Sequence, residues 1–163
     1  RWSGKIPEGS ESGEIASTLD FLPTFAKLAG AKLPGNSIDG HDMSPILLGK
    51  EGAKSAHEAF YYYQMDQLQC VRSGKWKLHL ALESKKRNWG KPEGKVAMQL
   101  YDLEADIGES KNISADHPEV VKRLVALAEK AREELGDVDR PGKGQRKAGW
   151  VEKASPRLIQ APN

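Results

Sequence analysis

Residues 67–80 read QLQCVRSGKWKLHL, and this stretch decides the fold. Side chains of a strand point alternately to opposite faces, and three apolar residues alternate here with three polar ones. The apolar set is Trp76, Leu78 and Leu80, and the polar set is Lys75, Lys77 and His79. The dipeptide Ser73-Gly74 is typical of a two-residue hairpin turn. Two antiparallel strands, over 67–72 and 75–80, are therefore predicted.

Two more strands and one helix complete the prediction around this hairpin. Residues 60–63 (FYYY) and 99–103 (QLYDL) have the composition of short strands, and short connections favour an antiparallel meander. From His117 to Leu135 apolar residues recur every three or four positions, which predicts a helix lying on the sheet. The stripe consists of Val121, Leu124, Ala128 and Leu135, and Asp116 and Glu119 stand at capping-box spacing. The predicted fold class is α+β, with a four-stranded antiparallel sheet packed by a C-terminal helix.

The N-terminal part has a different pattern. Residues 15–19 predict a short strand, and Asp20 is placed to cap a helix over 21–29 that ends at Gly30. The alternative is one helix from Glu14 onward, but it would place Pro23 in the interior at a cost of about 3 kcal/mol. The segment also carries more apolar residues than one small sheet can cover: Ile15, Leu19, Phe21, Leu22, Phe25 and Leu28.

Composition limits the classes of function. Of 163 residues 38% are hydrophobic, and 25 Lys and Arg against 23 Asp and Glu leave a net charge of only +2. No overall field therefore attracts nucleic acid or an anionic membrane, and no apolar run approaches the roughly 20 residues that span a bilayer. The single cysteine, Cys70, permits no internal disulfide. Because the first residue is Arg1 rather than Met, we expect the chain to be part of a longer protein.

Three stretches, taken in order, resemble the C-terminal part of a formylglycine-dependent sulfatase of the arylsulfatase A type, in the alkaline-phosphatase-like superfamily. They are the segment over 1–49, with a strand, a helix and an IDG turn that lead into a Pro-Leu-Leu-Gly-like close, VRSGKWKLHL at 71–80, and LYDLEADIGESKNIS at 100–114. The resemblance implies three parts: residues 1–52 as a segment of the parent α/β core, 53–136 as the sheet and helix subdomain, and 137–163 as an extended tail. Within the tail, Trp150 or Leu158 is expected to hold it to the body.

The resemblance also implies a parent enzyme that hydrolyses sulfate esters with a formylglycine, made from Cys or Ser in a Cys-x-Pro-x-Arg-like segment, and a calcium ion. This chain has no such segment, because Cys70 is followed by Val71 and Arg72. We expect no catalytic residue and no metal site here; Asp39, His41 and Asp42 are explained by a turn at Gly40. The missing N-terminal catalytic domain is then the main partner, and relatives are commonly exported, periplasmic or lysosomal.

The remaining candidate site is cationic. Residues 72–95 contain eight Lys or Arg against two Glu, a local excess of +6. This excess is typical of a solvated sheet face, but in a sulfatase it also suits binding of a sulfated small molecule or glycan. His79, Lys77 and Lys75 are the predicted substrate contacts. Two other functions stay open: a freestanding module that binds sulfated glycans, and a purely structural domain that supports a neighbour.

Overall fold

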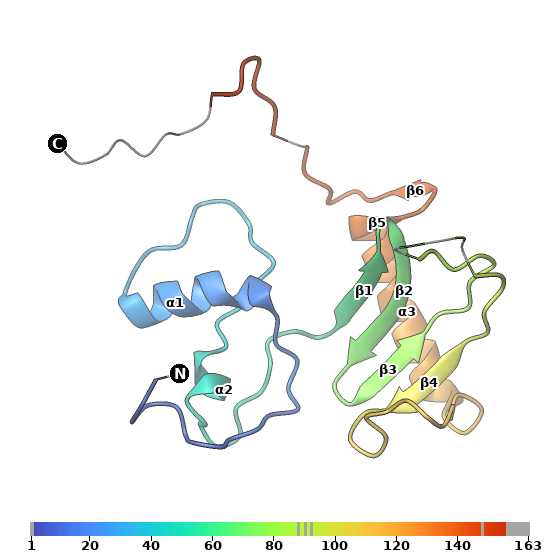
Figure 1. The fold of residues 1–163 in the computed structure, drawn as a ribbon, viewed down its shortest axis with the longest axis horizontal. Helices are drawn as coiled ribbons and strands as arrows, with labels where there is room; N and C mark the ends of the chain where they lie inside the picture. The colour runs from blue at the N-terminus through green and yellow to red at the C-terminus, as the bar shows by residue number, and fades with distance from the viewer. Residues whose placement is uncertain (1, 88, 90, 92, 148, 156–163) are drawn as a thin grey trace.

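The computed structural model describes residues 2–87, 89, 91, 93–147 and 149–155. Two lobes lie side by side in Figure 1. One is the N-terminal lobe with the short 3-10 helix η1 (Thr18–Asp20) and helices α1 (Phe21–Ala29) and α2 (Ser44–Leu47). The other is a sheet covered on its rear face by helix α3 (Pro118–Leu135), with a tail leaving from the top. The α+β prediction is confirmed. The boundaries proposed at residues 52 and 136 stay a prediction.

The sheet has the predicted four strands in the order β1-β2-β3-β4, and all its pairs are antiparallel. The strands are β1 (Phe60–Gln64), β2 (Gln67–Ser73), β3 (Trp76–His79) and β4 (Gln99–Asp102). Leu78 pairs with Val71 on one side and Leu100 on the other, so a fully buried apolar row crosses the sheet. This register leaves Lys77 and His79 on the opposite face.

Helix α3 packs on the apolar row through Leu124, Leu127, Ala128 and Ala131, and Val121 is partly buried beside them. The placement of Leu135 in this core was wrong, since its side chain is 40% exposed. The end of α3 lies against the β1–β2 hairpin, where Tyr63 donates to the Gly136 carbonyl, and Leu135 lines an open hollow there with Tyr63 and Met65. The capping box was also wrong, because α3 begins at Pro118 with His117 as N-cap and no side-chain cap bond.

The N-terminal lobe corrects one prediction and confirms another. Residues 15–19 form no strand. Instead, the Ser17 hydroxyl accepts the backbone N–H of Leu19, and its backbone N–H donates to Asp20, which closes η1. Helix α1 has the predicted bounds and ends at Gly30, whose φ of 65° is left-handed. The Asp20 carboxylate makes no cap bond to α1. It accepts the Ser17 N–H in the capping box of η1 and also binds groups from other segments described below.

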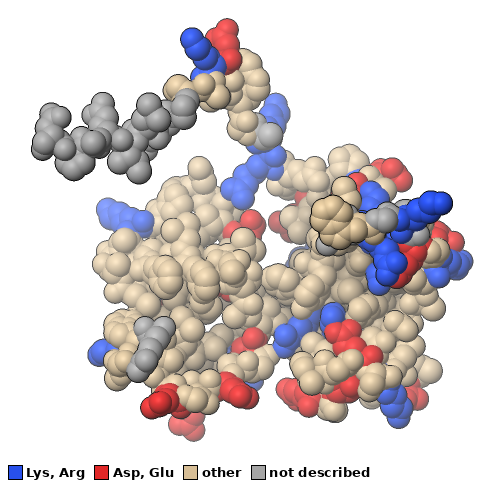
Figure 2. Space-filling model, viewed as in Figure 1, with Lys and Arg blue, Asp and Glu red and all other residues tan. Residues whose placement is uncertain are grey.

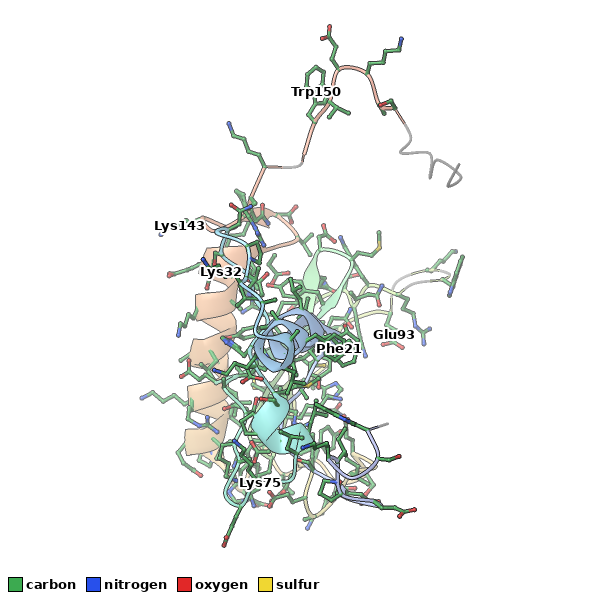
Figure 3. The ribbon with its side chains drawn as sticks, turned by 90° about the vertical axis from the view of Figure 1, so that its left-hand side faces the viewer. Phe21, Lys32, Lys75, Glu93, Lys143 and Trp150 are labelled. Carbon is green, nitrogen blue, oxygen red and sulfur yellow. The ribbon has the colours of Figure 1, made fainter. Side chains whose placement is uncertain are left out.

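Helix α1 leaves most of its apolar side chains uncovered. Leu19, Phe21, Leu22, Phe25 and Leu28 are 39–59% exposed, while Ile15 is buried, contrary to expectation. The Phe21 and Phe25 rings stack at 5.6 Å, and Figure 3 shows Phe21 on the helix nearest the viewer. This lobe therefore presents five exposed apolar side chains, one from η1 and four from α1.

The tail begins with a two-strand hairpin, β5 (Gly136–Asp137) and β6 (Arg140–Pro141). Arg146 then reaches the N-terminal lobe, donating to the Ser37 carbonyl at 2.9 Å. Trp150 is 81% exposed and projects from the tail in Figure 3, so its expected packing role was wrong; Leu158 lies outside the described residues. No described helix is long and apolar enough to cross a membrane.

Candidate functional site

The outer face of the sheet, opposite α3, carries a pair of cationic or imidazole side chains that share one carboxylate. Lys77 Nζ lies 2.5 Å from Glu109 Oε1, and His79 Nε2 lies 2.5 Å from Glu109 Oε2. Glu109 belongs to the loop after β4 and has a φ of 52°. The Asp106 carboxylate accepts the backbone N–H groups of Ser110 and Lys111, which fixes the loop around this strained residue.

The surroundings of His79 favour the neutral form of its ring. Burial lowers the pKa of His79, although the hydrogen bond and charge of Glu109 act in the opposite direction. Burial alone would raise the pKa of Glu109, but its contacts with Lys77 and His79 outweigh this and lower it. Because the Glu109 carboxylate can only accept, the neutral ring carries its proton on Nε2. Nδ1 can then accept a hydrogen bond from the Cys70 thiol, whose Sγ lies 3.4 Å away.

Lys75 does not join this pair. Its Nζ lies 2.6 Å from Asp102 Oδ2 and 4.8 Å from the centroid of the Trp76 ring. Strand alternation placed Lys75 with Lys77 and His79, but β3 begins only at Trp76 and Lys75 still belongs to the turn. The structure thus brings two of the three predicted residues together, and each of the three has a carboxylate partner. Their role in binding substrate stays a prediction.

A second polar cluster, which the sequence analysis missed, centres on Asp20. Its carboxylate accepts the N–H groups of Ser17 and His41 at 2.8 Å each, and His57 Nε2 lies 2.8 Å from Oδ1. Asp20 is 1% exposed, and burial alone would raise its pKa, but these hydrogen bonds prevail and lower it. The His41 and His57 rings meet edge to face at 4.7 Å. From the sequence, helix capping is a sufficient explanation for Asp20. No local pattern indicates that His41 and His57, 21 and 37 residues away, bind its carboxylate.

Thr24, four residues after Asp20, holds the loop before α2 in place. Thr24 Oγ1 accepts the Met43 N–H at 2.9 Å. A Cβ on Gly40 would lie 1.9 Å from the Leu19 carbonyl oxygen, so only glycine permits this approach. Asp20 and Thr24 therefore join two sequence motifs, LDFLPT at residues 19–24 and IDGHDMSP at residues 38–45. Asp42 accepts the Ser44 N–H, and no group of three His, Cys, Asp or Glu side chains among the described residues could hold a metal ion.

A hollow of about 720 Å³ separates the two lobes. Glu14 lines it and accepts hydrogen bonds from the Ser55 N–H at 2.8 Å and the Lys54 ammonium at 3.0 Å. Arg72 donates to the Gly13 carbonyl at 2.6 Å, which ties the sheet to the N-terminal lobe. Arg72 and Lys75 line this hollow, whereas Lys77 and His79 do not.

Comparison with known proteins agrees with the sheet and helix arrangement. A profile for the C-terminal region of aryl-sulfatase matches residues 55–157. Arylsulfatase A of Homo sapiens is 35% identical over 145 residues, covering 77% of this chain and 28% of that protein. Arylsulfatase D of Homo sapiens is 31% identical over 167 residues, covering 84% and 27%.

Two solved structures are similar to this chain in fold and sequence. One, described under metabolism of multiple glycosaminoglycans by Bacteroides thetaiotaomicron, has a TM-score of 0.55 and 30% identity, covering 69% of this chain and 24% of that one. Ps i-CgsB in complex with k-i-k-neocarrahexaose has a TM-score of 0.58 and 27% identity, covering 79% and 27%. The chain belongs to the sulfatase family. It corresponds to the C-terminal region of an aryl-sulfatase and spans 27–28% of the length of the two human relatives.

Proposed function

We propose that the protein containing this chain hydrolyses sulfate esters, and that this chain completes its catalytic domain from the C-terminal side. The observation that carries the proposal is the match of residues 55–157 to the C-terminal region of aryl-sulfatase. The substrate is a sulfated small molecule or glycan. Lys77 and His79, and more distantly Lys75, are the proposed contacts to its anionic group, which would compete with Glu109 and Asp102 for them.

The nucleophile and the metal belong, in this proposal, to the upstream part of the protein. Cys70 is a poor fit to a formylglycine precursor, because it lacks the Cys-x-Pro-x-Arg context and lies 8% exposed inside β2. Burial raises the pKa of its thiol, so the thiolate is disfavoured. The described residues gather no donor set for calcium either. No catalytic step is therefore assigned to this chain, and alone it is expected to be inactive.

The upstream catalytic part is the proposed partner of the apolar face of α1. Five apolar residues there are at least 39% exposed, and burying them against another apolar surface is favourable at about 25 cal/mol per Å². Large exposed apolar patches are rare on monomeric proteins and commonly mark sites of protein–protein interaction. The charged outer face of the sheet, by contrast, suits contact with substrate.

Turnover of an aryl sulfate tests the proposal. The protein with its upstream region should release the phenol, and the 163-residue chain should not. In the longer protein Cys70→Ser should leave kcat unchanged, because the nucleophile lies elsewhere. Turnover by the isolated chain that Cys70→Ala abolishes would refute the assignment, as would a folded longer protein inactive on both aryl and glycan sulfates.

A further inference from the structure

The tail that follows α3 turns back onto the end of that helix. The last carbonyls of an α-helix have no partner within the helix, so they need donors from elsewhere. Three donors come from the tail, and their acceptors are the last three carbonyls of α3: Lys143 N–H to Glu133 at 2.8 Å, Gly144 N–H to Glu134 at 2.8 Å, and Gln145 Nε2 to Leu135 at 2.5 Å. Residues 143–145 therefore cap the C-terminal end of α3.

Two glycines permit this close path of the tail. A Cβ on Gly142 would lie 2.3 Å from the Glu134 carbonyl oxygen, and a Cβ on Gly144 would lie 2.8 Å from Glu134 Cγ. Real Cβ atoms do not approach other heavy atoms this closely, so a larger residue at Gly142 would push the backbone away from α3. The contact between the tail and the helix thus depends on glycine.

The start of the tail is also fixed to the sheet. The Tyr63 hydroxyl donates to the Gly136 carbonyl at 2.8 Å, and Asp137 Oδ1 accepts the Leu68 N–H at 3.1 Å. The other oxygen of Asp137 lies 2.7 Å from Arg132 Nε, in a pair whose side chains are only 18% and 16% exposed. Residues 136–145 are therefore held by β1, β2 and α3 together.

Beyond this fixed part, the tail reaches the N-terminal lobe through Arg146. Its Nη1 donates to the Ser37 carbonyl at 2.9 Å, and its Nη2 lies 3.5 Å from Asp39 Oδ2, so it meets the loop between α1 and α2. Among the residues that the structure describes, no other tail side chain forms a hydrogen bond with this lobe. Figure 1 shows the tail leaving β6 and passing above the N-terminal lobe, and in Figure 2 blue side chains follow its path.

The Arg146 contact differs from the fixed part of the tail in its exposure to solvent. The side chains of Arg146 and Asp39 are 67% and 71% exposed, and exposed ion pairs are weak and screened by salt. The second tie between the lobes, from Arg72 to the Gly13 carbonyl, lies at the opposite end of the sheet in Figure 1. If the Arg146 contact is lost, the N-terminal lobe stays attached only at that end and through the segment between α2 and β1.

We infer that residues 136–146 form a strap between the lobes, with residues 136–145 as its fixed end and Arg146 as a contact that opens as the ionic strength rises. When this contact opens, the N-terminal lobe turns about Arg72 and the segment between α2 and β1, and the hollow of about 720 Å³ between the lobes changes in width. The inference concerns the arrangement of the lobes, so it does not depend on hydrolysis of a sulfate ester.

A distance between spin labels on the two lobes tests the strap in the 163-residue chain. The labels are placed at Lys27→Cys in α1 and Lys122→Cys in α3, with Cys70→Ser to remove the native thiol. We expect one narrow distance distribution at about 0.01 M salt and a broad one at about 1 M, because the Debye length falls from about 30 Å to about 3 Å. Arg146→Ala and Gly142→Ala should each give the broad distribution already at low salt.

Two control variants separate the strap from general effects of charge and of tail sequence. Lys147→Ala removes the same charge from the next residue, and Gly149→Ala adds a Cβ where nothing lies within 4 Å. Both should keep the narrow distribution at low salt. A narrow distribution in Arg146→Ala or Gly142→Ala would overturn the strap, as would a broad one in Lys147→Ala or a parent protein that does not respond to salt. Far-UV circular dichroism checks that every variant is folded.

Discussion

Glu109 and His79 are joined by a 2.5 Å hydrogen bond between Oε2 and Nε2, across 30 residues of sequence. The second oxygen of the same carboxylate binds Lys77, so one acidic residue in a left-handed conformation neutralises the centre of the outer face. Lys77 and His79 can therefore bind an anion only if the anion competes with the Glu109 carboxylate already in place.

Replacing Glu109 by glutamine should lower the pKa of His79 further. Burial already depresses it, and only the carboxylate opposes burial. A depressed histidine pKa means that folding is favoured while the ring is neutral, so stability is full above about pH 6.5 and falls as the pH drops below it. Glu109→Gln should increase the stability lost at low pH and extend the loss to lower pH. An NMR pH titration of the His79 ring measures the shift, with exposed Glu104→Gln as the control; a higher His79 pKa in Glu109→Gln would contradict the geometry.

The same substitution should strengthen sulfate binding at Lys77. Freed of its carboxylate, the ammonium gains about threefold in affinity for inorganic sulfate, since partly exposed ion pairs are each worth under about 1 kcal/mol. Chemical shifts at Lys77 and His79 during a sulfate titration measure the gain. The double variant Glu109→Gln with Lys77→Ala should lose it, and a gain that survives in the double variant would place the anion elsewhere.

Asp20→Ala should destabilise the N-terminal lobe by about 1–3 kcal/mol, because it leaves two partly buried N–H donors and His57 without their acceptor. Its lowered pKa predicts stability that is present above about pH 3.8 and lost as the pH falls through the folded pKa. Hydrogen exchange of the His41 and Met43 amides reports the loss. Asp39→Ala, at an exposed carboxylate, should leave these amides protected, and equal exchange in both variants would contradict the role of Asp20.

Gly40→Ala should disrupt the contact between the two N-terminal motifs. The added Cβ would meet the Leu19 carbonyl oxygen at 1.9 Å, so the backbone must move, at a cost of about 3 kcal/mol or more. Gly35→Ala is the matched control, since nothing lies within 4 Å of its Cβ position. Thermal unfolding followed by tryptophan fluorescence and amide exchange at Met43 compares the two. Equal stability of the variants would show that the loop relaxes freely.

Two leucines of α3 should differ sharply when cut to alanine. Leu124 is fully buried against the sheet, so Leu124→Ala should cost about 2–5 kcal/mol, and Leu135→Ala, at the exposed helix end, under about 1 kcal/mol. Urea unfolding monitored by circular dichroism measures both. A loss at Leu135 as large as that at Leu124 would mean that the last turn is covered in solution.

The sequence by itself determined the four strands, their antiparallel order and the helix that covers them. Alternation over 75–80 and the three-to-four repeat over 121–131 are local patterns, and burial of one face follows directly from them. The bounds of α1 were equally local, because Pro23 fits only a first turn and Gly30 takes the left-handed C-cap. Family motifs added the class of the parent protein but not the contacts between those motifs.

Only the tertiary structure decided the partners of the polar residues. One oxygen of Asp20 accepts the local Ser17 N–H, as a cap would, whereas the other accepts from His41 and His57, because the packing of distant loops brings those donors within 2.8 Å. Glu109, which binds His79 and Lys77, has a left-handed backbone conformation and lies in a loop that no periodic pattern predicts. Lys75 does not join Lys77 and His79 because the strand begins one residue later. Leu135 is not in the core because it faces an open hollow beside Tyr63 and Met65. Periodicity fixes which face a side chain lies on, whereas the group that meets it there depends on how loops of different length close in three dimensions.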